Sequence, residues 1–205
     1  MSEELKLNEN VGAPQPDALA RIARKDDFLQ QLQEFLAQHK GENWCVSAID
    51  IEHFKLYTEL YGAQQAHSLM LSLTALLLEH SKATGSPVGY FGNNDFVLCL
   101  PDDKEQQLAI ISQLQTCVNS HRQDVTFFLS FGVCPVAEHP DADAQTLCSY
   151  AQIASVDPSP AVGGVHRFTP AMLSCLKKQR QLLSELEHAL KNHEFCFFLQ
   201  PKCNS

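Results

Sequence analysis

The apolar residues of this chain recur with two different periods. Leucine, isoleucine and phenylalanine return every three to four positions in several segments, which predicts helices with one apolar face. These segments are residues 17–39, 66–80, 102–121, 143–155 and 170–192. Shorter apolar runs bounded by glycine, proline or asparagine predict strands. They are residues 44–51, the two arms of a hairpin around Gly92-Asn93-Asn94-Asp95, residues 125–136 and residues 165–168.

The order of these elements predicts the fold class. It contains a β-α-β-β-α-β pattern, which is typical of a mostly antiparallel sheet of about five strands flanked by helices. The sequence therefore predicts an α/β (α+β) domain with a ferredoxin-like sheet over residues 17–169, followed by a linker helix over residues 170–193. Residues 1–16 lack periodicity and contain prolines and a glycine, so we expect a flexible leader there.

Composition narrows the range of partners. The formal net charge of −9 disfavours nucleic acid and anionic membranes, which attract positive surfaces. No apolar run is long enough to span a membrane, so we expect no membrane contact and a cytoplasmic location, alone or within a larger membrane-anchored protein. The eight cysteines form no C-x-x-C pair, so we expect no disulfide or zinc framework. Cys45, Cys99 and Cys134 are interpreted as core residues of strands.

Several separated motifs occur in an order that resembles the GGDEF family, whose active members condense two GTP molecules into cyclic di-GMP. The motifs are Asp17-Ala18-Leu19 with Phe28, Asp50-Ile51-Glu52-His53-Phe54-Lys55 with Gly62, the hairpin Gly92-Asn93-Asn94-Asp95-Phe96, and Leu129-Ser130-Phe131-Gly132-Val133. The resemblance implies a nucleotide-cyclase fold. It also implies an active site at the hairpin, with several of its positions changed.

The resemblance implies a metal site that survives only in part. In the family, carboxylates hold two magnesium ions against the triphosphate, and these positions fall on Asp50 and Asn94, with the backbone carbonyl of Ile51 beside them. Asn94 is a neutral amide, and magnesium prefers anionic oxygen. Asp95 keeps the acidic position that assists the developing charge, so it is the one vestigial catalytic residue. We expect no required cofactor, and magnesium only where a nucleotide binds.

The implied nucleotide contacts are altered as well. The family's guanine-binding asparagine and aspartate become Thr58 and His67, and a neutral imidazole offers one acceptor. The second glycine of the signature turn becomes Asn93, whose side chain crowds the nucleotide. The family's phosphate-binding lysine has no counterpart in residues 154–157. The other positions implied to bind nucleotide are Phe54, Lys55 and Gly92.

The end of the chain resembles a second family. Residues 194–205, with Gln200-Pro201-Lys202, are similar to the opening of an EAL domain, which implies a parent protein that hydrolyses cyclic di-GMP. We therefore expect a catalytically silent module that modulates the adjacent EAL phosphodiesterase through domain contacts, homodimerisation or weak GTP binding. The alternative is a diguanylate cyclase that functions despite its substitutions. An ordinary structural interpretation also stays open: Asp50 as a turn or cap residue, the hairpin as a plain turn and His67 as a surface residue.

Overall fold

The computed structural model describes residues 18–121, 125–156 and 164–196. The expected leader, Asp17, most of the loop after residue 156 and the segment 197–205 lie outside the described residues. The contacts divide the chain into one unit that ends at Phe168 and a second that begins at Thr169. The first unit contains the sheet and the candidate site.

The first unit is built on a five-stranded sheet with the order β2-β3-β1-β4-β5. The strands are β1 (Trp44–Ile51), β2 (Val88–Gly92), β3 (Asp95–Pro101), β4 (Leu129–Pro135) and β5 (Gly164–Arg167). Strand β1 pairs antiparallel with both β3 and β4, while β5 pairs parallel to β4. The predicted mostly antiparallel sheet and its β-α-β-β-α-β order are confirmed.

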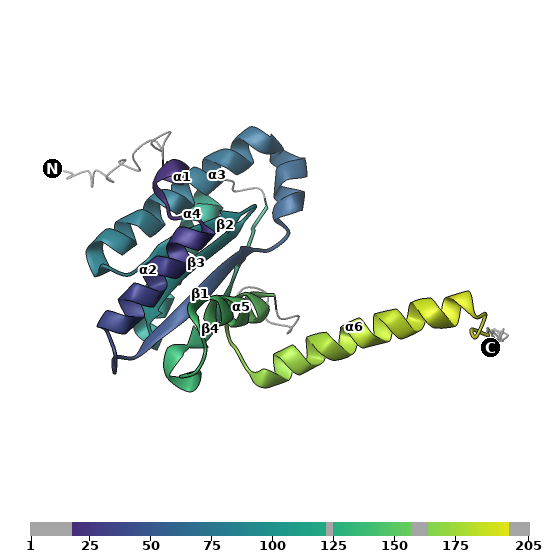
Figure 1. Ribbon diagram of the computed structural model, residues 1–205. Helices are drawn as coiled ribbons and strands as arrows, with labels where there is room; N and C mark the ends of the chain where they lie inside the picture. The colour runs from purple at the N-terminus through teal and green to yellow at the C-terminus, as the bar shows by residue number, and fades with distance from the viewer. Residues whose placement is uncertain (1–17, 122–124, 157–163, 197–205) are drawn as a thin grey trace, which may run out of the picture. The chain divides into compact units, whose positions relative to one another are not determined.

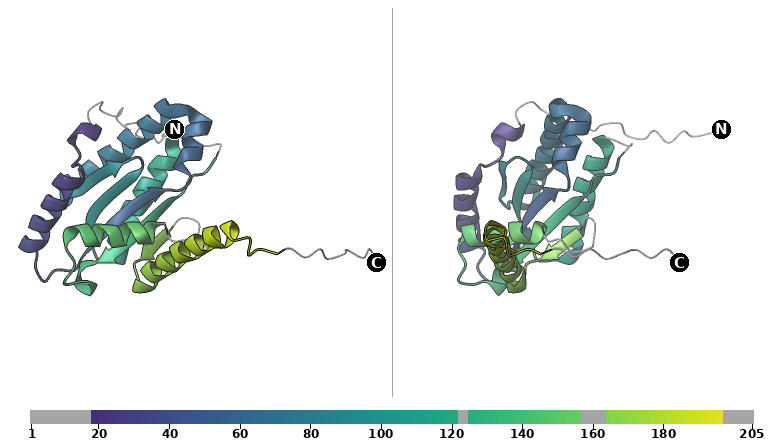
Figure 2. Two further views of the ribbon diagram at one scale, coloured as in Figure 1. Left: turned by 45° about the vertical axis from the view of Figure 1, so that its right-hand side comes forward. Right: turned by 90° about the vertical axis from the view of Figure 1, so that its right-hand side faces the viewer.

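Helices cover both faces of this sheet. They are α1 (Ala18–Arg21), α2 (Lys25–Gln38), α3 (Phe54–Thr84), α4 (Lys104–His121) and α5 (Ala144–Ser155), with a 3-10 turn, η1 (Val136–Glu138). Helices α3 and α4 lie on one face, and α2 and α5 lie on the other (Figures 1 and 2). The central strand β1 is therefore covered on both sides, which explains its nearly continuous run of buried residues.

The first predicted helix, residues 17–39, is interrupted. Helix α1 ends at Arg21 and α2 begins at Lys25, because Ala23 forms a parallel bridge to Gly89 of β2. The backbone N–H of Tyr90 donates to the Ala23 carbonyl at 2.9 Å, so this residue pairs with the sheet instead of continuing the helix. Periodicity alone does not reveal such a long-range bond.

Helix α3 starts twelve residues before the predicted residue 66, at Phe54. The buried apolar face of this helix does not extend to its first turns, where Leu56 and Leu60 are exposed. Gly62 breaks the helical conformation, with φ 82° and ψ 161°, and separates this first segment from the long buried one. His67, expected at a helix start, therefore lies inside the second segment.

Two other predicted boundaries shift inward. Helix α4 begins at Lys104 rather than residue 102, because Asp103 caps it by accepting from the backbone N–H of Gln106 at 2.9 Å. Strand β4 covers Leu129–Pro135, so the predicted strand over residues 125–136 was too long. Val125 and Phe128, which precede it, are 41% and 38% exposed. The apolar run in the sequence does not show where the segment before the strand ends and β4 begins.

The described cysteines are all free thiols. Cys45, Cys99 and Cys134 are buried in strands, as the sequence predicts. Burial raises the pKa of Cys45 and of Cys134 to about 12. These two thiols therefore stay protonated and behave as apolar core residues.

The second unit contains α6 (Pro170–Lys191), so a helix is present within two residues of the range 170–193 expected for one. Residues 194–196, where the resemblance to an EAL domain begins, have no regular structure. Among the described residues, no helix is both long and apolar enough to cross a membrane.

Candidate functional site at the hairpin

The site lies where β1 ends beside the β2-β3 hairpin. The register pairs Gly92 with Asp95, so Asn93 and Asn94 form a tight two-residue turn. Gly92 has φ 106° and Asn93 has φ 51°, two left-handed conformations that glycine and asparagine tolerate at low cost. The hydroxyl of Tyr90 donates to the Asn93 carbonyl at 2.7 Å and fixes the turn from inside the hairpin.

Asn94 is bound to the end of β1. Its side-chain amide Nδ2 donates to Oδ1 of Asp50 at 2.8 Å and to the backbone carbonyl of Ile51 at 3.3 Å. One NH2 group therefore joins the two oxygen atoms that the family resemblance assigns to metal binding. The opposite orientation of the amide would place its oxygen against two acceptors, so the partners themselves determine the orientation.

The residues at this point do not fit a pair of magnesium ions. Magnesium requires several oxygen ligands, preferably charged, in near-octahedral geometry. Here a neutral donor occupies the space between Asp50 and the Ile51 carbonyl. Across residues 18–121, 125–156 and 164–196, no group of three or more histidine, cysteine or acidic side chains that could hold a metal ion is found. We therefore derive no catalytic step through a metal at this site.

The two carboxylates of the site repel each other. Burial raises the pKa of Asp50, while the hydrogen bond from Asn94 opposes that effect. Burial and the charge of Asp50 both raise the pKa of Asp95. The Asn94 amide therefore compensates part of the cost of burying the Asp50 charge.

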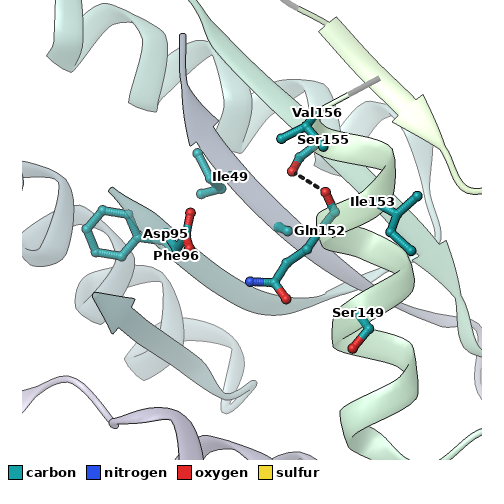
Figure 3. A pocket seen from close by; sticks show the side chains of 9 residues that line it. Ile49, Asp95, Phe96, Ser149, Gln152, Ile153, Ser155 and Val156 are labelled. Carbon is teal, nitrogen blue, oxygen red and sulfur yellow. Dashed lines mark hydrogen bonds between the residues drawn. The ribbon is translucent and has the colours of Figure 1, made fainter. Parts of the chain in front are cut away.

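Most of the predicted site residues line two neighbouring depressions, but Gly92 lines neither. Asn93, Asn94, Phe54 and Lys55 line a shallow one of about 460 Å³, together with Asp50, Ile51 and His53. Asp95 lies in another, of about 410 Å³, between the strands and α5 (Figure 3). Asp95, expected to be catalytic, and Asn94, expected at the metal site, are adjacent in sequence but line different depressions.

The predicted guanine contacts line neither of these depressions. The Thr58 hydroxyl donates to the backbone carbonyl of Phe54 at 3.1 Å, so it is engaged within its own helix. His67 is exposed and lies beyond the Gly62 break. Lys55 is exposed at the rim of the shallow depression, where its ammonium group can reach an anionic ligand.

Polar side chains of α5 share the pocket of Asp95, and they were not among the predicted site residues. Figure 3 shows Ser149, Gln152 and Ser155 on the face of α5 that lines this pocket, with Gln152 extending toward the strands. The Ser155 hydroxyl donates to the Gln152 carbonyl at 2.9 Å. Their i, i+3, i+6 spacing was the available signal, because it places them on one helix face.

Replacing Asp95 by asparagine is expected to raise the melting temperature at about pH 7. Because the pKa of Asp95 in the folded chain is raised above its ordinary 3.8, the wild type loses stability as the pH rises through that raised pKa. The variant lacks this loss, so its advantage should vanish below pH 3.8. Thermal unfolding followed by circular dichroism across this range measures the difference.

Asp141→Asn is the control, because it removes the same charge from an exposed loop residue. It should leave the melting temperature nearly unchanged across the same pH range. A lower melting temperature for Asp95→Asn at about pH 7 would show that the Asp95 charge is favourable in the folded protein, against this prediction.

Comparison with known proteins supports the fold described above. The family described as "Diguanylate cyclase, GGDEF domain" matches residues 15–157. No curated protein matches the sequence. The family match, the sheet order and the hairpin together define a domain with the GGDEF fold. Since the match covers well over half of the sequence, the chain belongs to the GGDEF family.

Solved structures show the same fold. The isolated GGDEF domain of TpbB (YfiN) from Pseudomonas aeruginosa is 19% identical with a TM-score of 0.63, covering 78% of this chain and 98% of that chain. The active GGEEF domain of a diguanylate cyclase from Vibrio cholerae is 16% identical, with a TM-score of 0.59 and coverage of 73% and 99%. An EAL/GGDEF domain protein from M. capsulatus is 18% identical, with a TM-score of 0.50 and coverage of 70% and 97%.

Proposed function

We propose that this GGDEF domain is a catalytically silent regulatory module of cyclic di-GMP signalling. The observation that carries the proposal is the pair of hydrogen bonds from the Asn94 amide to Asp50 and to the Ile51 carbonyl. A cyclase needs a cation at this place, to offset the charge that develops on the transferring phosphate. Here the protein satisfies the same oxygen atoms with its own neutral donor.

The nucleotide contacts support the same conclusion. Thr58 bonds to its own helix and His67 is exposed, so neither offers the bidentate acceptor that distinguishes guanine from other bases. Lys55 remains as a basic side chain at the shallow depression. Any GTP binding that persists is therefore weak, and serves sensing rather than turnover.

We propose further that the module acts on an adjacent EAL phosphodiesterase domain of the same parent protein. The support is the similarity of residues 194–205 to the opening of an EAL domain. A solved structure with this fold belongs to a protein described as an EAL/GGDEF domain protein, which is an example of the two domain types named for one protein. An intact E-x-L motif encoded after Ser205 would support the parent's hydrolysis of cyclic di-GMP, and its absence would contradict it.

The proposal is tested by incubating the purified chain with GTP and magnesium and measuring cyclic di-GMP by chromatography. We expect no product above the level of a no-protein blank. The active Vibrio cholerae GGEEF domain, run in parallel, shows that the assay detects turnover. Product formed by the wild type, and lost in Asp95→Asn, would establish the alternative function, a working diguanylate cyclase.

A calorimetric titration with GTP then distinguishes two modes of regulation by a silent module: nucleotide sensing and regulation without nucleotide. Heat of binding that is reduced in Lys55→Ala indicates a weak nucleotide sensor at the shallow depression. No heat at millimolar GTP excludes the sensor and leaves domain contacts or dimerisation as the mode of regulation.

A further inference from the structure

Helix α6 carries an apolar stripe that is exposed to solvent. None of the described side chains of this helix is buried. Five of its leucines are 37–58% exposed, namely Leu176, Leu182, Leu183, Leu186 and Leu190, while Met172 and Leu173 near its start are partly buried. A contiguous exposed stripe of leucines is unfavourable in water and is typical of a surface that binds a partner.

The spacing of the stripe is that of a coiled-coil seam. Steps of four and three residues alternate along the series Met172, Leu176, Gln179, Leu183, Leu186 and Leu190. This is a seven-residue repeat, which keeps a seam facing one partner helix. The seam is apolar at every position except Gln179.

We propose that α6 pairs with α6 of a second copy of this chain, in antiparallel orientation. The register is centred between Leu183 and Leu186. Leu183 of one copy then packs against Leu186 of the second copy, and Leu186 of the first against Leu183 of the second. Since such a pairing has two-fold symmetry, every contact occurs twice. The central layers of the pair are then four leucines.

The residues that flank the seam support this register. On one side, Arg180 of each copy faces Glu187 of the other, which gives two complementary charge pairs. On the other side, Leu182 of each copy faces Ala189 of the other, a large apolar residue against a small one. Both flanks are thus complementary in the same register.

Parallel pairing is less favourable for the same residues. It would bring Leu182 against Glu187, an apolar side chain against a carboxylate, and would give Arg180 no acidic neighbour across the seam. Its one gain would be a hydrogen bond between two copies of Gln179. In the antiparallel pair, Gln179 faces Leu190 near the helix end, where the amide reaches water. The charges therefore favour the antiparallel orientation.

Sedimentation equilibrium of the full 205-residue chain tests the proposal through charge reversal. Arg180→Glu and Glu187→Arg should each weaken dimerisation about tenfold, because two attractive pairs become repulsive. The double variant should restore the wild-type dissociation constant. In one helix these two residues lie two turns apart, so the rescue reports on a contact between copies.

Two further variants complete the design. Lys178→Glu makes the same charge change on the outer face of α6, and should leave the dissociation constant unchanged. Leu183→Glu should make the protein monomeric while the helical circular dichroism of the whole chain is retained. A wild type that is monomeric up to millimolar concentration, a dimer that survives Leu183→Glu, or a double reversal without rescue would each overturn the proposal.

Discussion

Replacing Gly132 by alanine is expected to lower the free energy of unfolding by about 3 kcal/mol, the upper end of the usual cost of overpacking. Gly132 lies in β4 directly beneath α5, and a β-carbon there would overlap the backbone oxygen of Ala151 and the backbone nitrogen of Ser155. Backbone atoms of a buried helix cannot move aside as a flexible side chain can, so α5 itself has to shift. Because α5 also lines the pocket of Asp95, that pocket should change with it. Urea unfolding followed by circular dichroism measures the loss.

Gly164→Ala is the matched control for this prediction. Gly164 lies in β5, in the same sheet, and among the described residues a β-carbon there meets only the His166 imidazole at an ordinary 3.6 Å. The control should change the stability by less than about 1 kcal/mol in either direction. Equal effects of the two substitutions would show that the close approach of α5 to β4 is not what requires glycine at position 132.

Elements whose determinants are local could be predicted from the sequence. Strand β1 was predicted from Trp44 to Ile51, and the structure has the same bounds, because a buried central strand is a continuous apolar run between polar breaks. The hairpin followed from its Gly-Asn-Asn turn. The break before α2 could not be predicted, since it depends on the bond between Ala23 and Gly89 across the sheet.

The candidate site was predictable as a set of positions but not as a set of contacts. Family resemblance placed Asp50, Ile51 and Asn94 together, and they do lie together. It did not indicate that the Asn94 amide donates to both of its neighbours, because the direction of a side chain depends on the packed hairpin. It likewise grouped Asp95 with Asn94, although the alternation of side chains along β3 turns Asp95 toward α5.

Replacing Asn94 by aspartate is expected to lower the free energy of unfolding by about 2 kcal/mol at about pH 7. The substitution removes a donor to a charged carboxylate and places a second carboxylate against Asp50 and the Ile51 carbonyl. The new side chain should have a pKa raised by this repulsion and by burial. The loss of stability should therefore fade as the pH falls toward the ordinary carboxyl pKa.

Magnesium should reverse this loss in the variant and have no effect on the wild type. The variant offers the carboxylates of residues 50 and 94 and the Ile51 carbonyl to a hard cation, and a ligand that binds only the folded state stabilises it by mass action. Melting temperatures with and without millimolar magnesium measure the effect. Asn94→Ala is the control: it loses the same hydrogen bonds but gains no charge, so it should be destabilised and not respond to magnesium. If the wild type responds as strongly as Asn94→Asp, the amide does not exclude the cation, and the argument for a silent site loses its main support.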